Sequence, residues 1–241
     1  MLEIFPGESD LKKAIWGGYP AGRADFLRSK GIVLLLLLHT FSVGVSQNSN
    51  YTFNFEQLTV DQGLSHSTVH TIIEDRKGMI WIGTQFGLNR YDGYEFKVFL
   101  PQADHQNQIR GHSVYSLMED RKGDIWIGHQ ERGISIYASQ TESFHPFPAT
   151  TFPSIDWETI SVRSIFQDSK GNIWIGTYGA GAVVLDENRQ PIMQLCSFCD
   201  SANRRLSNDF VFDFEEDTRG NVWIGTGGSG VELYDPGRDA L

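Results

Sequence analysis

Apolar and polar residues alternate along four stretches of the chain, and each stretch is followed by a polar turn and a second apolar run. The first stretches read TVHTIIED, SVYSLMED, SVRSIFQD and FVFDFEED, and the runs after the turns read MIWIGT, DIWIGH, NIWIGT and NVWIGT. Alternation with a period of two residues, built from β-branched and aromatic side chains, predicts β-strands. A third strand-like stretch follows in every unit, and a fourth follows in the first three units. We therefore expect short antiparallel strands in groups of four, with the last group ending before its fourth strand.

The turn between the first two strands of each unit keeps the form D-x-[KR]-G. An Asp at the first position of such a turn can accept hydrogen bonds from backbone amides ahead of it, and the Gly can supply a positive φ. Alternation places the Trp after the turn on one face of its sheet, where we expect it to fill the space between neighbouring sheets. The predicted structural residues are Asp75, Asp120, Asp168, Asp217, Gly78, Gly123, Gly171, Gly220, Trp81, Trp126, Trp174 and Trp223.

The four tryptophans of these units are 45, 48 and 49 residues apart. A period in the forties with strand-like content is typical of one β-propeller blade. The sequence thus predicts an all-β fold of β-propeller blades, with four four-stranded antiparallel repeats. The blades are expected at about residues 51–100, 101–148, 149–196 and 197–241. A four-bladed ring, closed by the strand-like stretch TFNFEQLT near the N-terminus, is the alternative to an open, partial propeller.

Units of the form V-x-x-I-x-x-D-x-x-G-x-I-W-I-G-T-x-x-G-L resemble two-component regulator propeller repeats, and the resemblance covers about residues 51–235. It implies blades of a seven-bladed type in the periplasmic sensor region of hybrid two-component sensor kinases. It also implies a non-catalytic module that detects a glycan fragment, in a receptor that is attached to the inner membrane. The chain departs from this family in having four units and no ATP-binding signature. We therefore expect a fragment, truncated before any kinase domain.

The N-terminal residues predict an extension and an export signal over residues 1–46, followed by the repeats over 47–241. Arg23, Arg28 and Lys30 precede the apolar run GIVLLLLLHTFSVGVSQ, which has the length of a signal-peptide core. An uncleaved anchor is the alternative. Export predicts a periplasmic location. The formal net charge of −10 argues against nucleic acid as a partner, because an acidic surface repels phosphate.

Candidate catalytic and metal-ligating residues give weak signals. The turn acids recur in every unit and are expected to cap turns, and the histidines do not recur at equivalent positions. Cys196 and Cys199 favour two small side chains in a loop over a local disulfide, and they offer only half of a zinc site. No enzyme activity, cofactor or metal is therefore predicted. Other propeller blades or a second copy of the chain are the expected protein partners.

The loops between blades are the predicted place for a ligand. In propellers these loops meet the loops between second and third strands at one mouth of the central channel. Trp157 belongs to such a loop and is a candidate platform for a sugar ring, while Arg110, Asn208 and Asp209 precede innermost strands. These four residues are the predicted ligand-binding set for an oligosaccharide. The alternative to a sensory module is a free-standing periplasmic propeller for protein interaction, or a lyase-like enzyme.

Overall fold

The structure is a computed structural model that describes residues 55–102, 108–199, 205–238 and 241. The chain divides into two compact units, residues 1–55 and 56–241, and the strands of the described residues belong to the second. The predicted extension and export signal, residues 1–46, lie outside the described residues. Among the described residues, no helix has the length and apolar character that a membrane span requires.

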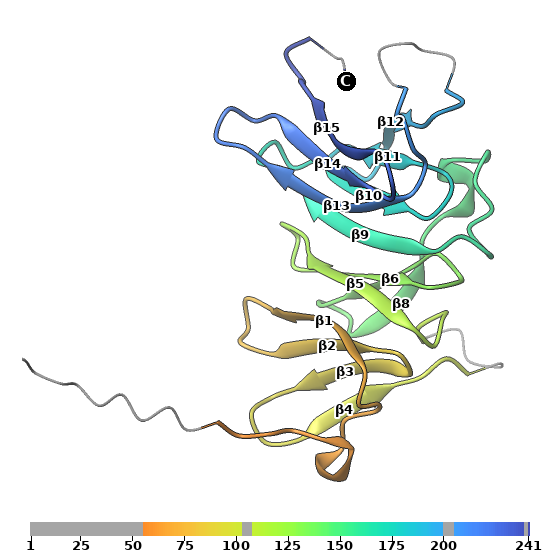
Figure 1. Ribbon diagram of the computed structural model, residues 1–241. Helices are drawn as coiled ribbons and strands as arrows, with labels where there is room; N and C mark the ends of the chain where they lie inside the picture. Colours follow the sequence, from red (N-terminus) through yellow and green to blue (C-terminus); the bar gives the residue numbers. More distant parts are fainter. Residues whose placement is uncertain (1–54, 103–107, 200–204, 239–240) are drawn as a thin grey trace, which may run out of the picture. The chain divides into compact units, whose positions relative to one another are not determined.

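Four antiparallel sheets follow one another in chain order (Figure 1), which confirms the predicted all-β propeller architecture. The first comprises β1 (Val69–Glu74), β2 (Ile80–Thr84), β3 (Gly87–Tyr91) and β4 (Phe96–Phe99). The second comprises β5 (Val114–Glu119), β6 (Ile125–His129), β7 (Ile134–Ala138) and β8 (Ser143–Pro146). The third comprises β9 (Val162–Gln167), β10 (Ile173–Thr177), β11 (Ala182–Leu185) and β12 (Pro191–Leu195). The last comprises β13 (Val211–Glu216), β14 (Val222–Thr226) and β15 (Gly230–Tyr234).

Each sheet is a blade whose strands pair in order along the chain, so the first strand of each blade is its innermost. The described residues also contain two short 3₁₀ helices, η1 (Val60–Gln62) and η2 (Ala149–Thr151). Strand β1 contacts β5, β5 contacts β9, and β9 contacts β13. The innermost strands of successive blades therefore lie side by side, as they do around the channel of a propeller.

The repeated turn is held by its Asp through both carboxylate oxygens. In the third blade, Oδ1 of Asp168 accepts the backbone amides of Lys170 and Asn172 at 3.0 and 2.8 Å. Its Oδ2 accepts the indole N–H of Trp174 at 3.0 Å. The same three bonds occur in the other blades at Asp75, Asp120 and Asp217. The glycine of each turn has a φ between 79° and 93°, a conformation that glycine adopts without steric cost.

Three of the four repeated tryptophans are buried between blades. Trp81 packs with Tyr137 and Phe144 of the second blade, and Trp126 packs with Ile165 and other residues of the third. Trp174 packs in the same way against residues of the last blade. A fully buried Trp removes roughly 150 to 250 Å² from water, so these rings are a large part of each interface.

Hydrogen bonds at the turn rim add to this packing. The backbone amide of Arg76 donates to Glu119 of the next blade at 3.0 Å. At the following junction the amide of Arg121 donates to Gln167 at 2.8 Å. Ser169 donates its amide and hydroxyl to Glu216 at 2.6 Å each. The turns of the first three blades are thus each tied to the end of the innermost strand in the blade that follows.

The first and last blades each leave one face open. Trp223 is 43% exposed, and Val231 and Leu233 on the neighbouring strand are exposed as well. At the other end, Val69 and Ile72 of the first blade are exposed, although their counterparts in later blades are buried. A four-bladed ring would cover both faces, so the described residues form an open set of blades. The part of TFNFEQLT that the structure describes, from Phe55 onward, contains no strand.

Cys196 and Cys199 form a disulfide in the loop after β12, with their Cα atoms 5.2 Å apart. The favoured expectation of two separate thiols was therefore wrong. Spacing alone left the two possibilities open, because a C-x-x-C segment closes a disulfide only when its backbone turns. Here the amide of Cys199 bonds to the carbonyl of Cys196 at 3.3 Å and makes that turn.

Candidate ligand-binding site

The innermost strand of every blade contains a β-bulge at the same place. The pairing register of β1 with β2 skips from Val69 to Thr71, and the other three blades skip the equivalent residue. A bulge changes the direction of the side chain that it leaves unpaired. The skipped residues are His70, Tyr115, Arg163 and Phe212, which we call the bulge column.

The bulge column is continuous across the four blades. The rings of His70 and Tyr115 have centroids 4.6 Å apart. The guanidinium carbon of Arg163 lies 4.1 Å from the centroid of Tyr115 and 5.9 Å from that of Phe212. Burial and the nearby charge of Arg163 lower the pKa of His70, which keeps its imidazole neutral at pH 7. The column therefore places one cation between aromatic rings on the innermost strands.

Arg163 has no hydrogen-bond or ion-pair partner among the residues that the structure describes. Its Nε–H is shielded from solvent and donates no hydrogen bond. The side chain as a whole is half-buried. Other half-buried guanidinium groups have a hydrogen-bond or ionic partner: Arg110 pairs with Glu158, Arg189 pairs with Asp120 and Asp124, and Arg90 donates to the hydroxyl of Tyr137. Arg163 is the exception, a partly desolvated cation held only by aromatic rings.

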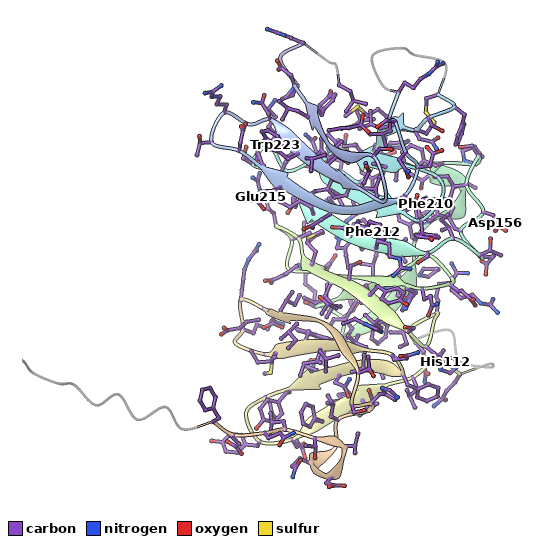
Figure 2. All side chains as sticks on the ribbon, in the orientation of Figure 1. His112, Asp156, Phe210, Phe212, Glu215 and Trp223 are labelled. Atoms are coloured by element: carbon purple, nitrogen blue, oxygen red, sulfur yellow. A yellow bond between two sulfur atoms is a disulfide. The ribbon has the colours of Figure 1, made fainter. Side chains whose placement is uncertain are left out.

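Two exposed aromatic pairs lie beside the column where loops of successive blades meet. Phe86, between β2 and β3, stacks on His112 before β5 with centroids 4.7 Å apart. Tyr178, between β10 and β11, stacks on Phe210 before β13 at 4.3 Å. Figure 2 labels His112, Phe210 and Phe212. Tyr178 also contacts Arg163, with 5.1 Å from its ring centroid to the guanidinium carbon. These pairs occupy the mouth at which the sequence predicted a ligand.

An open pocket of about 620 Å³ lies at the junction of the first two blades. Its lining includes Arg110, His112, Gln130 and Arg132, so it is mainly polar. Glu158 binds both arginines, and its hydrogen bond from Arg110 lowers its pKa. The Glu158 carboxylate therefore remains ionised and offsets the charge of this pocket.

The structure does not present Trp157 to solvent. The ring is 1% exposed, packs against Phe147 with centroids 4.6 Å apart, and donates its indole N–H to the carbonyl of Phe152. This buried ring has no free face for a sugar, so we exclude it from the site. A loop of the same composition can fold over an apolar surface or project from it, and periodicity does not distinguish the two.

The other predicted residues divide between the pocket and the scaffold. Arg110 lines the pocket described above. Asn208 accepts the amide of Phe210 and donates to the carbonyl of Gly227. Asp209 accepts the amide and the hydroxyl of Ser197. Asn208 and Asp209 therefore position the loop that carries Phe210, and their polar groups are already bonded.

The described residues contain no cluster of three or more His, Cys, Asp or Glu side chains that could hold a metal ion. His129 is fully buried and bonds Ser135 at 2.9 Å. Burial lowers its pKa to about 3, which suits a neutral core residue.

Sequence reasoning missed the bulge column, although the repeats contain a signal for it. The position after the first Val of each unit is His, Tyr, Arg or Phe in turn. Most neighbouring positions repeat closely from unit to unit. A position that varies among large side chains inside a repeated frame is a candidate for function, because packing between like blades does not require the variation.

Comparison with known proteins supports the same units. Residues 63–86, 108–131, 158–179 and 205–228 match the family described as two component regulator propeller. An 84-residue segment is 33% identical to Histidine kinase P4 of Formosa agariphila, covering 34% of this chain and 6% of that protein.

Two solved structures from B. thetaiotaomicron have similar folds. The extracellular domain of the hybrid two component system BT3049 is 23% identical with a TM-score of 0.67, over 77% of this chain and 25% of that one. The extracellular domain of BT4673 is 25% identical with a TM-score of 0.57, over 71% and 22%. The chain thus spans a quarter or less of these relatives. Each of its four blades contains a segment that matches the two component regulator propeller family.

Proposed function

We propose that this chain is a non-catalytic, ligand-binding propeller module of an exported two-component receptor, and that its ligand is an oligosaccharide. The repeat family and the extracellular domains with similar folds support the receptor assignment. The basic residues and apolar run near the N-terminus support export to the periplasm. Kinase activity would belong to other domains of a full-length receptor.

The exposed aromatic pairs carry the proposal. Phe86 with His112 and Tyr178 with Phe210 each hold an exposed ring against a residue of the next blade. Sugars present apolar C–H faces that stack on such rings, while polar groups around the site orient their hydroxyls. Gln130 and Arg110 at the adjacent pocket are suitable polar groups. Because each pair bridges two blades, a bound sugar would contact several blades at once.

Isothermal titration calorimetry of the full chain against a panel of neutral and acidic oligosaccharides tests this function. We expect saturable binding of one sugar class, weakened about 3- to 10-fold by Tyr178→Ala through the loss of ring stacking. Tyr94→Ala is the matched control, because Tyr94 is an exposed aromatic residue in the β3–β4 turn. Absence of binding across the panel, or equal effects of the two variants, would contradict the proposal.

A free-standing propeller that binds protein is the second candidate function. The open apolar face around Trp223 and Val231 favours it, since exposed patches of this kind often mediate protein contacts. Association through that face in a chain that binds no sugar would favour this alternative.

A further inference from the structure

We propose that Arg163 anchors a carboxylate of the ligand, so that the oligosaccharide bound at this mouth contains a uronic acid. This inference rests on the proposed function and adds the chemical class of the sugar. It also assigns a binding role to the bulge column.

The first step is the missing counter-charge. Removing part of a guanidinium group from water is unfavourable unless an anion or hydrogen-bond acceptors replace the water. Arg110 and Arg189 are half-buried and have carboxylate partners, and the half-buried Arg90 donates to the hydroxyl of Tyr137. Arg163 is half-buried and has none in the described part of the chain, and its Nε–H is unpaired. An anionic ligand would supply the missing partner.

The second step is the direction of the free donors. Tyr115 and Tyr178 lie 4.1 and 5.1 Å from the guanidinium carbon of Arg163. Rings that stack on a guanidinium contact its faces, and its N–H donors point outward in its plane. A carboxylate is planar, carries two oxygens and matches this fork with two parallel hydrogen bonds. Stacking also removes rotamer freedom in advance, which reduces the entropy cost of binding.

The third step joins the cation to the sugar platform. Tyr178 contacts both Arg163 and Phe210, so an exposed ring and an unpaired cation lie next to each other. A uronic acid has the corresponding pair of features, an apolar ring face and a carboxylate attached to the same ring. A neutral sugar would leave the cation unpaired. The formal net charge of −10 disfavours highly charged polyanions, so a sugar with isolated carboxylates fits best.

The test compares a uronate-containing oligosaccharide with the same oligosaccharide after its carboxyl groups are reduced to alcohols. Calorimetry uses the full chain with Arg163, Arg163→Gln, Arg163→Lys and the distant control Arg219→Gln. We expect the unsubstituted chain to bind the acidic form about 10- to 100-fold more tightly, a preference that weakens with added salt. Arg163→Gln abolishes the preference but retains binding of the reduced sugar. Arg163→Lys retains part of the preference for the acidic form, and Arg219→Gln retains the whole preference.

Several results would overturn the inference. Equal affinity of the unsubstituted chain for both forms, or an unchanged preference in Arg163→Gln, removes Arg163 as the anchor while leaving oligosaccharide sensing intact. Stronger binding of a sulfated neutral oligosaccharide rejects the carboxylate. A chain that binds none of these sugars overturns both the inference and the proposed function. Circular dichroism and thermal melting establish that each variant is folded.

Discussion

Trp126 donates its indole N–H to Oδ2 of Asp120 at 3.0 Å. The same oxygen accepts a hydrogen bond from Nη2 of Arg189, in the next blade, at 2.6 Å. One carboxylate therefore holds the turn of its own blade, the buried Trp and a hairpin of the neighbour. Arg189 also lies 5.2 Å from the centroid of the Trp126 ring. The repeated Asp thus contributes to the interface as well as to the turn.

The Asp-to-Trp bond predicts unequal effects of one substitution in two blades. Asp168→Ala removes two turn bonds and leaves the buried N–H of Trp174 without its acceptor, so we expect a loss of about 2 to 4 kcal/mol in unfolding free energy. Asp217→Ala is the matched change, where the bond to the exposed Trp223 is 3.4 Å long. We expect Asp217→Ala to lose clearly less unfolding free energy than Asp168→Ala. Urea titration followed by Trp fluorescence measures both, and equal losses would contradict this account.

Arg189 predicts a strong dependence of the second interface on one charge. Arg189→Gln leaves the buried Asp120 without its ionic partner, which we expect to cost about 2 to 4 kcal/mol. Arg238→Gln is the control, because its ion pair with Asp235 is largely exposed and such pairs contribute under about 1 kcal/mol. Thermal unfolding of both variants provides the measurement. A similarly small decrease in melting temperature for both variants would contradict the prediction that the buried ion pair stabilises the interface.

His129 predicts a pH dependence of stability. Burial holds its pKa at about 3, so the folded chain keeps it neutral while the unfolded chain protonates it below pH 6.5. The unfolded state therefore binds more protons between pH 6.5 and 3, and stability falls as the pH falls, by at most about 1.4 kcal/mol per pH unit from this group.

Substitution separates this contribution from that of the carboxylates. His129→Thr introduces the residue found at positions 84, 177 and 226, where the hydroxyl bonds a glycine carbonyl. We expect its stability to decline less between pH 6.5 and 3 than that of the unsubstituted chain. His145→Gln changes an exposed His and should leave the slope unchanged. Parallel slopes for His129→Thr and the unsubstituted chain would reject the assignment.

The open face of the last blade predicts self-association of the isolated chain. Trp223, Val231 and Leu233 are exposed there, and burying them against another blade is favourable. We expect sedimentation velocity to detect concentration-dependent association that Trp223→Glu reduces. Tyr94→Glu, at a 94% exposed residue of the β3–β4 turn, should have no effect. A monomer at all concentrations would contradict the prediction.

The sequence predicted the blades because the information is local. Alternation identified the strands, and the Asp and Gly of each turn fixed the hairpin between the first two. Trp81, Trp126 and Trp174 lie between blades as expected, since each has a following blade to cover it. Trp223 is exposed because no described blade follows it.

The site was less predictable because it depends on side-chain direction and on contacts between distant residues. The bulges turn Tyr115 and Arg163 toward each other, although they are 48 residues apart in sequence. Alternation assumes an unbroken register and would assign such residues to the ordinary sheet face. Trp157 was misjudged for a related reason, since its surroundings come from Phe147 and Phe152 and not from its own strand pattern.

The rim bonds between Arg76 and Glu119, and between Arg121 and Gln167, join the turn of one repeat to the strand end of the next. The second and third repeats each contain both a donor turn and an acceptor strand end, so a single genetic unit encodes the two complementary halves of its own junction. Tandem duplication of such a unit creates a compatible neighbour without further mutation. Arrays of different lengths can therefore evolve by copying or deletion, while substitutions at the bulge position alter recognition independently of assembly.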